Sequence, residues 1–424
     1  MKSGLLIRAF ALMLVLSGCG VPDRVVNVAG PDGSQTGGAG APATDTTGSG
    51  GPGASGAGTG PGAAGAGGGA VSECDAGIPK LGACPPYVLP ATCDAQYLND
   101  SHNCCVPMRD CQGGACVEGK CQPVLIVGDA GVDAEDIGVA GDFLVWATGC
   151  NKELRRCTKT GAGEARLPKG LYCTPTMAIG GNDAYWIEWD GPYLNSVPVD
   201  GSAPRRVVAE VTDGRAHFGA LVVDAERAYW ATQENPPGIW YAPLDGEHTK
   251  AVAVASMPGS GLSKETALRP NGVAVDKAYL YWSDENAHAI KRRSLSTLGS
   301  DTYADLLVTG EQAPQRLAVD AERIYWVTGD GLLRSRAKVD GACEPTTLAS
   351  KQPGIWSIVV DDRYVYWTNW VEGGSVNRVR KSGGAVEVLA TNQKWPRGLA
   401  QDCATIYWTN QNNWQIGEVV KIAK

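Results

Sequence analysis

The sequence predicts an all-β fold, a seven-bladed β-propeller of four-stranded antiparallel blades, from three observations. A tyrosine or valine followed by tryptophan recurs seven times, at Trp146, Trp186, Trp230, Trp282, Trp326, Trp367 and Trp408. These tryptophans are 40, 44, 52, 44, 41 and 41 residues apart, which is the period of stacked propeller blades. An aspartate stands six residues before the tryptophan in five of the seven units, where a short apolar run ends.

The sixth unit shows how one repeat divides into strands. Residues 357–360 and 365–368 are apolar or aromatic runs on either side of a polar turn. Residues 375–380 alternate small or apolar with polar side chains, and residues 386–389 form a fourth run after two glycines. Four short strands joined by such turns predict an antiparallel meander, and no sustained 3.6-residue period predicts a helix here.

The two ends of the repeat region predict how the ring closes. The seventh unit has a third strand at residues 416–422 and no fourth. Residues 123–127 form an apolar strand without a repeat of its own, and Leu125 lies 21 residues before Trp146, much as Leu389 lies 19 before Trp408. We therefore expect this N-terminal strand to complete the seventh blade, which would remove an exposed sheet edge and give a propeller over residues 122–424.

Composition narrows the class of partner. The chain has a formal charge of −8 and a pI near 5.2, so it lacks the basic footprint of a nucleic-acid-binding protein. The chain contains thirteen tryptophans and fourteen tyrosines but only three phenylalanines. This bias suits sheet cores with wet edges, because a large ring packs while its N–H or O–H finds a hydrogen-bond partner.

The N-terminus is predicted to be a targeting segment. Residues 9–16 form an apolar core too short to span a membrane, after a start that carries Lys2 and Arg8. The tetrapeptide Leu-Ser-Gly-Cys that ends at Cys19 resembles the cleavage box of bacterial lipoproteins. The resemblance implies a signal peptide over residues 1–18, a lipid on Cys19 and, since Gly20 is not an aspartate, an outer-membrane or cell-surface location. The alternative is an ordinary secretory peptide with an incidental cysteine.

Two segments separate Cys19 from the propeller. Residues 19–72 include stretches, such as 37–40 and 58–70, that are almost purely Gly, Ala, Ser, Thr and Pro; they predict a disordered linker, with a reach of roughly 40 Å as a flexible coil. Residues 73–121 hold eight cysteines: Cys74, Cys84, Cys93, Cys104, Cys105, Cys111, Cys116 and Cys121. Their even count and dense spacing in an exported chain predict a small module with four disulfides, either a spacer or a binding module, whose pairing stays open. A zinc site is the weaker interpretation, because no Cys-x-x-Cys pair occurs.

Five further cysteines lie in the predicted propeller: Cys150, Cys157, Cys173, Cys343 and Cys403. Cys150 and Cys157 could pair with each other, or either could pair with Cys173. Cys343 and Cys403 need not be bonded. An odd number leaves at least one thiol unpaired.

Several repeat units resemble the Tyr-Trp-Thr-Asp repeat of low-density-lipoprotein-receptor propellers. Tyr-Trp-Ser-Asp at 281–284 and Tyr-Trp-Thr-Asn at 366–369 and 407–410 carry the resemblance, and Leu-Asp-Gly at 244–246 supports it. The chain differs from that family in its seven rather than six predicted blades, and the closing aspartate survives only as Asp284. In style, the repeat units most resemble bacterial secreted receptor-related propellers of unknown function. This resemblance implies a fold and a location but no reaction.

The signature residues are assigned to the scaffold. Their Tyr and Trp rings wedge between neighbouring sheets, and burial of one ring is worth roughly 2–3 kcal/mol. The polar residue two positions after each tryptophan is expected to hydrogen-bond across the blade junction. The aspartate six positions before it is expected to accept backbone N–H bonds in the first hairpin turn.

Candidate ligand-binding residues are the tryptophans outside the repeats: Trp189, Trp240, Trp356, Trp370, Trp395 and Trp414. The loops between strands 2 and 3 and between consecutive blades share one face of a propeller, the loop face, and the spacing places all six near it. Arg316 and Arg397 join them there. Exposed aromatic rings with arginines are typical of surfaces that bind sugars or peptides. The alternative is that these rings only pack loops over blade junctions.

No catalytic or metal-binding residue is predicted. Propeller lyases and lactonases use His, or Glu and Asp ligands, at the channel mouth. The residues expected at five inner-strand starts include no acid: Gly219, Asn271, Gln315, Trp356 and Arg397.

We therefore predict a lipid-anchored cell-surface module that binds an unknown protein or carbohydrate, is not an enzyme and needs no cofactor. One alternative is a metal-dependent hydrolase or lyase in the propeller channel, which three or more carboxylates at one mouth would favour. Another is a structural envelope component.

Overall fold

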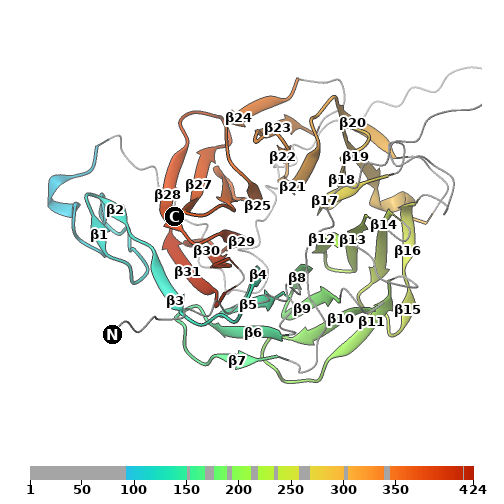
Figure 1. The fold of residues 1–424 in the computed structure, drawn as a ribbon, viewed down its shortest axis with the longest axis horizontal. Coiled ribbons are helices and arrows are strands. Elements are labelled where there is room, and N and C mark those ends of the chain that lie inside the picture. The colour runs from blue at the N-terminus through green and yellow to red at the C-terminus, as the bar shows by residue number, and fades with distance from the viewer. Residues whose placement is uncertain are drawn as a thin grey trace, which may run out of the picture. The chain divides into compact units, whose positions relative to one another are not determined.

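The computed structural model describes residues 92–149, 153–167, 176–188, 193–211, 218–233, 237–256, 268–299, 304–338, 344–413 and 415–424. Over these residues the chain forms seven blade sheets and one two-stranded sheet, and the helical segments are two 3-10 turns, η2 (Ala95–Tyr97) and η3 (Leu295–Thr297). The blades follow one another around a ring (Figure 1). The predicted seven-bladed propeller is confirmed. Within the described part of the chain, no helix has the length and apolar character needed to cross a membrane.

The first three blades are built from consecutive strands. Blade one contains β4 (Ala134–Ala140), β5 (Phe143–Thr148), β6 (Glu153–Thr158) and β7 (Ala165–Arg166). Blade two contains β8 (Thr176–Gly180), β9 (Asp183–Ile187), β10 (Tyr193–Pro198) and β11 (Arg206–Glu210). Blade three contains β12 (Phe218–Val223), β13 (Arg227–Thr232), β14 (Gly238–Pro243) and β16 (Val252–Ser256).

Blades four to six repeat the same order of strands. Blade four contains β17 (Pro270–Val275), β18 (Tyr279–Asp284), β19 (Ala289–Ser294) and β20 (Asp305–Thr309). Blade five contains β21 (Pro314–Val319), β22 (Arg323–Thr328), β23 (Leu333–Ala337) and β24 (Thr346–Ala349). Blade six contains β25 (Ile355–Val360), β26 (Tyr364–Asn369), β27 (Gly374–Arg380) and β28 (Glu387–Gln393).

Blade seven joins the two ends of the propeller chain. It contains β29 (Pro396–Gln401), β30 (Thr405–Asn410), β31 (Glu418–Ala423) and, as its outer strand, β3 (Val124–Val127). β3 pairs antiparallel with β31, so the predicted closing strand is confirmed. The innermost strands contact one another in the order β4, β8, β12, β17, β21, β25, β29 and back to β4, which closes the ring.

Blade two gains a fifth strand that the repeat does not predict. β15 (Thr249–Lys250), from the connection before the last strand of blade three, pairs in parallel with β11. Arg206 fixes this connection by donating to the carbonyls of Leu244 and Gly246 at 2.7 and 2.6 Å. Blades two and three are thereby joined by main-chain hydrogen bonds.

The signature residues form the core between blades. All seven signature tryptophans are fully buried. In blades three to seven the aspartate accepts turn N–H bonds and also the hydroxyl of the signature tyrosine, as Asp320 does from Arg323 at 2.7 Å and from Tyr325 at 2.8 Å. The scaffold assignment of these residues is confirmed.

Two residues that follow the signature tryptophan make hydrogen bonds across blade junctions, one of them as expected. Thr368 and Thr409, directly after the signature tryptophan, donate to the carbonyls of Arg397 and Glu135 in the next blade at 2.8 and 2.5 Å. Asn410, the next residue, donates to Gln393 of blade six at 3.2 Å, so the predicted bond from the residue two positions after the tryptophan is confirmed in blade seven. Side chains alternate along a strand, so Thr409 faces blade one, whereas Asn410 points to the other side, toward blade six.

A lysine from the next blade also reaches the signature aspartate at four junctions. The N–O distances are 2.5 Å for Lys338–Asp276, 2.6 Å for Lys381–Asp320, 3.1 Å for Lys424–Asp361 and 2.8 Å for Lys159–Asp402. Burial acts to raise the pKa of these four carboxyl groups. The hydrogen bonds and charges around them outweigh burial and hold each pKa below its usual value.

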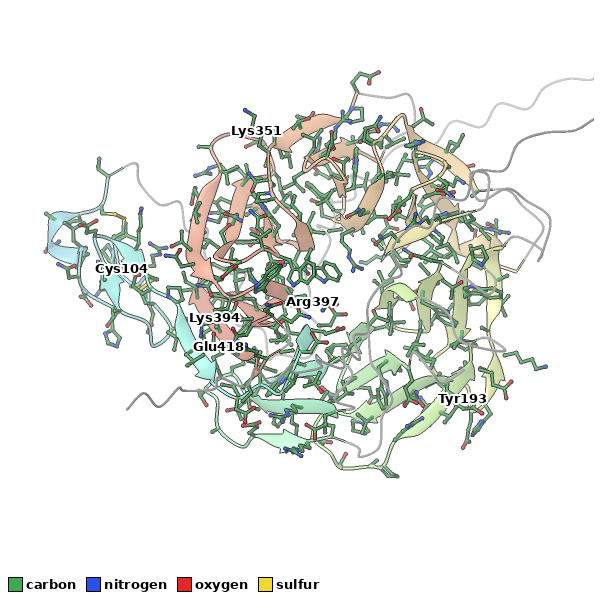
Figure 2. The ribbon with its side chains drawn as sticks, viewed as in Figure 1. Cys104, Tyr193, Lys351, Lys394, Arg397 and Glu418 are labelled. Carbon is green, nitrogen blue, oxygen red and sulfur yellow. A yellow bond between two sulfur atoms is a disulfide. The ribbon has the colours of Figure 1, made fainter. Side chains whose placement is uncertain are left out.

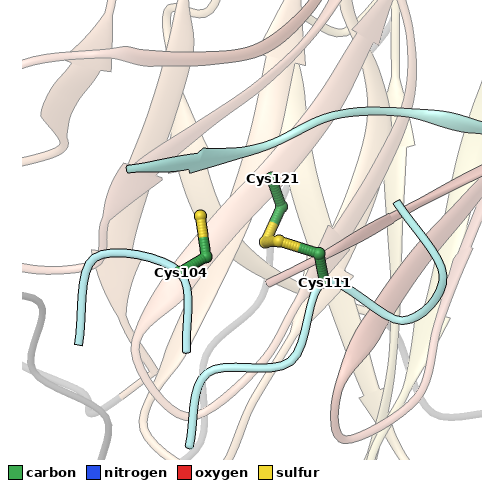
Figure 3. A group of neighbouring side chains, drawn as sticks. All are labelled: Cys104, Cys111 and Cys121. Carbon is green, nitrogen blue, oxygen red and sulfur yellow. A yellow bond between two sulfur atoms is a disulfide. The ribbon is translucent and has the colours of Figure 1, made fainter. Parts of the chain in front are cut away.

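The cysteine-rich module has three described disulfides, Cys93–Cys105, Cys104–Cys116 and Cys111–Cys121. It also contains β1 (Cys116–Val117) paired with β2 (Lys120–Cys121). The sulfur atoms of Cys104, Cys111 and Cys121 lie within 4.8 Å of one another (Figure 3). Because all three are bonded to other sulfurs, they offer no thiolate to a metal, and their closeness reflects neighbouring disulfides.

Two propeller cysteines can be assigned. Cys157 is a buried free thiol, and burial raises its pKa to about 11, so the alternatives in which Cys157 pairs were wrong. Cys403 is disulfide-bonded. Cys74, Cys84, Cys150, Cys173 and Cys343 lie outside the described residues, as do Cys19 and the linker.

Candidate functional site

Three of the candidate tryptophans meet on the loop face where blades six and seven join. The ring centroids of Trp356 and Trp370 are 5.0 Å apart at 48°, and those of Trp370 and Trp395 are 5.3 Å apart at 66°. All three side chains are partly buried, which lies between the exposed rings and the loop-packing rings that the sequence allowed. We call these three residues the tryptophan cluster.

Each ring of the tryptophan cluster is held by a different segment. Trp356 belongs to the inner strand β25, and Trp370 directly follows β26 and donates its backbone N–H to the carbonyl of Gly354 at 2.8 Å. Trp395 lies between β28 and β29 with φ +57°, and its carbonyl accepts the N–H of Gln411 at 3.0 Å. The rings therefore have a fixed backbone frame.

Arg316 and Arg397 stack on this cluster. The guanidinium carbons lie 5.0 and 4.4 Å from the ring centre of Trp356, and that of Arg397 is also 5.7 Å from Trp370. Both arginines start inner strands, β21 and β29. Figure 2 shows Arg397 at the inner side of the ring, whereas Tyr193 lies at its outer side.

Blade one adds three acids that the sequence reasoning missed. Arg397 Nη1 lies 3.0 Å from Glu135 and 3.6 Å from Asp133, both nearly fully buried. Asp136 accepts the backbone N–H of Met177 at 3.2 Å and interacts electrostatically with Arg316. We call these acids together with Arg316 and Arg397 the mouth network.

A sequence signal for Glu135 did exist. It precedes Trp146 by eleven residues, as Arg397 precedes Trp408, and the pairs Ile137–Trp146 and Leu399–Trp408 confirm the shared register. The expectation of acid-free inner-strand starts covered blades three to seven and omitted blade one. Asp133 and Asp136 then follow as neighbours of Glu135.

Burial is the largest cause of the pKa shifts of Glu135, Asp136 and Arg316. Burial, aided by the charges of Asp133 and Asp136 and opposed by that of Arg397, raises the pKa of Glu135 to about 8. Burial also raises the pKa of Asp136 and lowers that of Arg316, each against the attraction of the other.

A buried hydrogen-bond chain links the tryptophan cluster to the mouth network. Trp370 Nε1 donates to Gln411 Oε1 at 2.8 Å, and Gln411 Nε2 donates to Asp133. Gln411 is fully buried. These hydrogen bonds run from blade six through blade seven to blade one. The position of Trp370 therefore depends on the closure of the ring between blades seven and one.

The remaining candidate tryptophans behave differently. Trp240 lies on β14 and packs against the core of blades two and three, with its N–H on Thr232 Oγ1 at 2.8 Å. No described ring contact joins Trp240 to the tryptophan cluster. Trp189 and Trp414 lie outside the described residues.

The tryptophan cluster can hold a ligand, and the mouth network contains a group that can donate a proton. A partly buried aromatic surface with fixed guanidinium groups offers apolar and cation–π contacts. Glu135 has a carboxyl pKa near neutrality, as a general acid requires. The three acids alternate with arginines, and their oxygens do not converge into one ligand set among the residues described.

Comparison with known proteins supports the fold and the repeat type. No family model matches the chain. It is 29% identical over 151 residues to the vitellogenin receptor Yl of Drosophila melanogaster, covering 33% of this chain and 7% of that protein. It is 26% identical over 140 residues to the human low-density lipoprotein receptor-related protein 5-like protein, covering 31% of this chain and 54% of that protein.

The chain thus matches only part of either relative. A solved streptogramin B lyase structure matches with a TM-score of 0.56 at 9% identity, covering 71% of this chain and 97% of that one, and shows the fold alone. The relatives support a propeller similar to those of low-density-lipoprotein-receptor-related proteins.

Proposed function

We propose that this protein is a lipid-anchored cell-surface module that binds another protein through the tryptophan cluster. The observation that carries the proposal is the meeting of three partly buried indole rings from three separate segments beside two stacked arginines. Tryptophan and arginine are the residues most enriched at the energetic centres of protein interfaces. The similarity to receptor proteins agrees with a binding role.

A protein ligand fits the cluster better than a carbohydrate. Sugar rings stack on open indole faces, but Trp356 already carries Arg316 and Arg397, and Trp370 lies between the other two rings. The N–H of Trp370 is also used by Gln411. A protein segment can instead contact the ring edges that remain outside this stack.

Catalysis is the second candidate, because Glu135 is a buried acid whose pKa of about 8 lies in the range of general acids. It would support a hydrolase or lyase acting at the mouth network. The metal-dependent form of this idea fits less well, since Arg397 lies within 3.6 Å of two of the acids and would repel a cation. A structural envelope role is the third candidate and predicts no discrete ligand.

The test compares tryptophan variants in a soluble Cys19→Ser chain. Trp370→Ala should weaken binding to envelope protein fractions tenfold or more, as truncation of an interface centre does, and should cost only about 1–3 kcal/mol of stability, because the buried Gln411 oxygen loses its donor. Trp326→Ala should instead destabilise the fold by roughly 3–5 kcal/mol, because this ring is fully buried. Biolayer interferometry and thermal melts measure the two effects.

Trp240→Ala serves as the matched control, because Trp240 is a partly buried tryptophan outside the cluster. It should leave binding unchanged. Capture of polysaccharide but no protein, or equal binding by wild type and Trp370→Ala, would overturn the proposal. Turnover lost on Glu135→Gln would favour the enzymatic candidate.

A further inference from the structure

A small pocket opens on the loop face at the junction of blades five and six. It encloses about 290 Å³, at the lower end for ligand sites, so it suits one side chain or one small ring. Its polar lining comes from Gln315, Thr328, Asp330 and Gln352. Ile355 also lines it, and Trp356 is the next residue, so the pocket borders the tryptophan cluster.

Glycines keep this pocket open. Gly331 adopts φ +81° in the turn after β22, and a Cβ there would lie 2.5 Å from the carbonyl oxygen of Gln352. Gly354 adopts φ +58° and lies against the backbone of Trp370. The hydrogen bond from Gln352 N to the carbonyl of Gly331 at 3.0 Å fixes one wall to the other.

Asp330 supplies the only formal charge among the residues that line the pocket. Its exposed carboxylate accepts one hydrogen bond, from Thr328 Oγ1 at 2.5 Å, and has no ion-pair partner among the described residues. Two other acids on this face are ion-paired, Glu311 with Arg334 at 2.6 Å and Asp284 with Lys291 at 2.7 Å. The amide of Gln352 is already used, because it accepts from Trp367 and donates to the carbonyl of Ser350.

We propose that this pocket, named the Asp330 pocket, binds a lysine or arginine side chain of the protein that contacts the tryptophan cluster. The inference rests on the proposed function and adds the chemistry of the ligand. A basic side chain would pair with Asp330, and its guanidinium or ammonium donors could reach Gln315 and the backbone carbonyls of the glycine turns. The net charge of −8 also favours a basic partner over an acidic one.

Panning a random peptide display library on the immobilised full chain with Cys19→Ser tests the pocket. Peptides that bind should be enriched in one lysine or arginine at a fixed position. Asp330→Asn should weaken these peptides tenfold or more and reduce the salt dependence of binding. The amide oxygen of this variant would still accept the bond from Thr328, so the turn should fold. Asp362→Asn, an aspartate whose side chain is 76% exposed in a blade-six turn, should have no effect.

The outcomes separate the two proposals. Peptides that depend on Trp370 but show no basic residue and bind Asp330→Asn equally well would overturn the Asp330 pocket and leave the binding function intact. A library without any Trp370-dependent peptide would overturn both. Replacing the selected lysine by norleucine in a synthetic peptide should reproduce the loss caused by Asp330→Asn, and unchanged affinity would contradict the pocket.

Discussion

At the scale of single residues, the signature aspartate stabilises more than its own hairpin turn. It binds backbone N–H groups, the tyrosine hydroxyl and, at four junctions, a lysine of the next blade. Blade three lacks the lysine: its Asp224 faces a junction where Leu295 takes the equivalent place after β19. The lysines therefore act as ion-pair latches between particular blades.

Lys381→Met tests one latch. Loss of the contact with Asp320 and of the weaker bond to the carbonyl of Asp361 should cost roughly 1–3 kcal/mol at pH 7. Because the pKa of Asp320 is lowered in the folded state, this stabilisation is present above the unfolded pKa near 3.8 and is lost as pH falls through the folded pKa. Thermal melts from pH 7 to pH 2.5 should show the two proteins converging. The exposed Lys351→Met is the control, and a constant difference at all pH values would contradict the latch.

Glu135→Gln should have the opposite pH signature. The folded pKa of about 8 lies above the usual 4.5, so the folded state holds a proton that the unfolded state has released between these values. Wild-type stability therefore falls as pH rises from about 4.5 to 8, and glutamine removes that loss. The variant should match wild type near pH 4.5 and melt higher at pH 8. The exposed Glu372→Gln should show no such trend; a melting difference that does not change with pH would argue against a neutral Glu135.

Residue roles were predictable only where the repeat spacing fixes them. The aspartate–tyrosine pairs and the buried tryptophans follow from position within the unit. In the mouth network the spacing places Glu135 and Arg397 at inner-strand starts, but their contact depends on ring closure between distant segments. The side chains that accept the N–H of a signature tryptophan are an intermediate case. Glu311, Gln352 and Gln393 each stand fifteen residues before the tryptophan whose N–H they accept. This spacing is visible in the sequence, but its role becomes clear only in the structure.

At the scale of elements, strands were predicted well and connections poorly. Each blade repeats the same strand order, so periodicity determined the number of blades and the closing strand. β15 escaped prediction because it comes from a connection of blade three and depends on contacts of Arg206 across the junction. The tryptophan cluster was placed on the correct face, but its burial depends on loop geometry that spacing does not encode.

Substitutions in β3 can test both whether this strand closes the ring and which of its side chains face the core. Val127 in β3 is 7% exposed and Leu125 is 57% exposed, because a β-bulge between them shifts the pairing of β3 with β31 and turns the two side chains to different sides. Val127→Asp should therefore lower the melting temperature strongly, because it buries a charge, whereas Leu125→Asp should change it little. Deletion of residues 122–128 should destabilise further and promote aggregation at the open edge of β31. Deletion of seven linker residues, 60–66, is the length control; equal melting of all four proteins would rule out closure by β3.

At the scale of the whole molecule, the order of segments suggests why a binding face would be combined with a lipid. An acyl chain on Cys19 would hold the chain at a membrane at about 0.8 kcal/mol per buried CH₂ group. The linker over residues 19–72 would let the module and propeller sample a volume around the anchor, with a reach of roughly 40 Å. Such a tether raises the local concentration of the tryptophan cluster near other envelope components without adding a contact.

Cys19→Ser tests this arrangement in cells. The variant has no thiol for lipid attachment, so it should show no labelling with a clickable fatty acid and should keep its signal peptide, whereas the wild type should be labelled, lose its signal peptide and enter the detergent phase in a Triton X-114 partition. Ser34→Ala, a linker change of similar size, should be labelled and partition as wild type does. A Cys19→Ser protein that is still labelled and remains in the detergent phase would show that another residue anchors the chain. A wild-type protein found unlabelled in the medium would show that the segment is an ordinary secretory peptide, in which case binding through the tryptophan cluster would occur in solution rather than at a membrane.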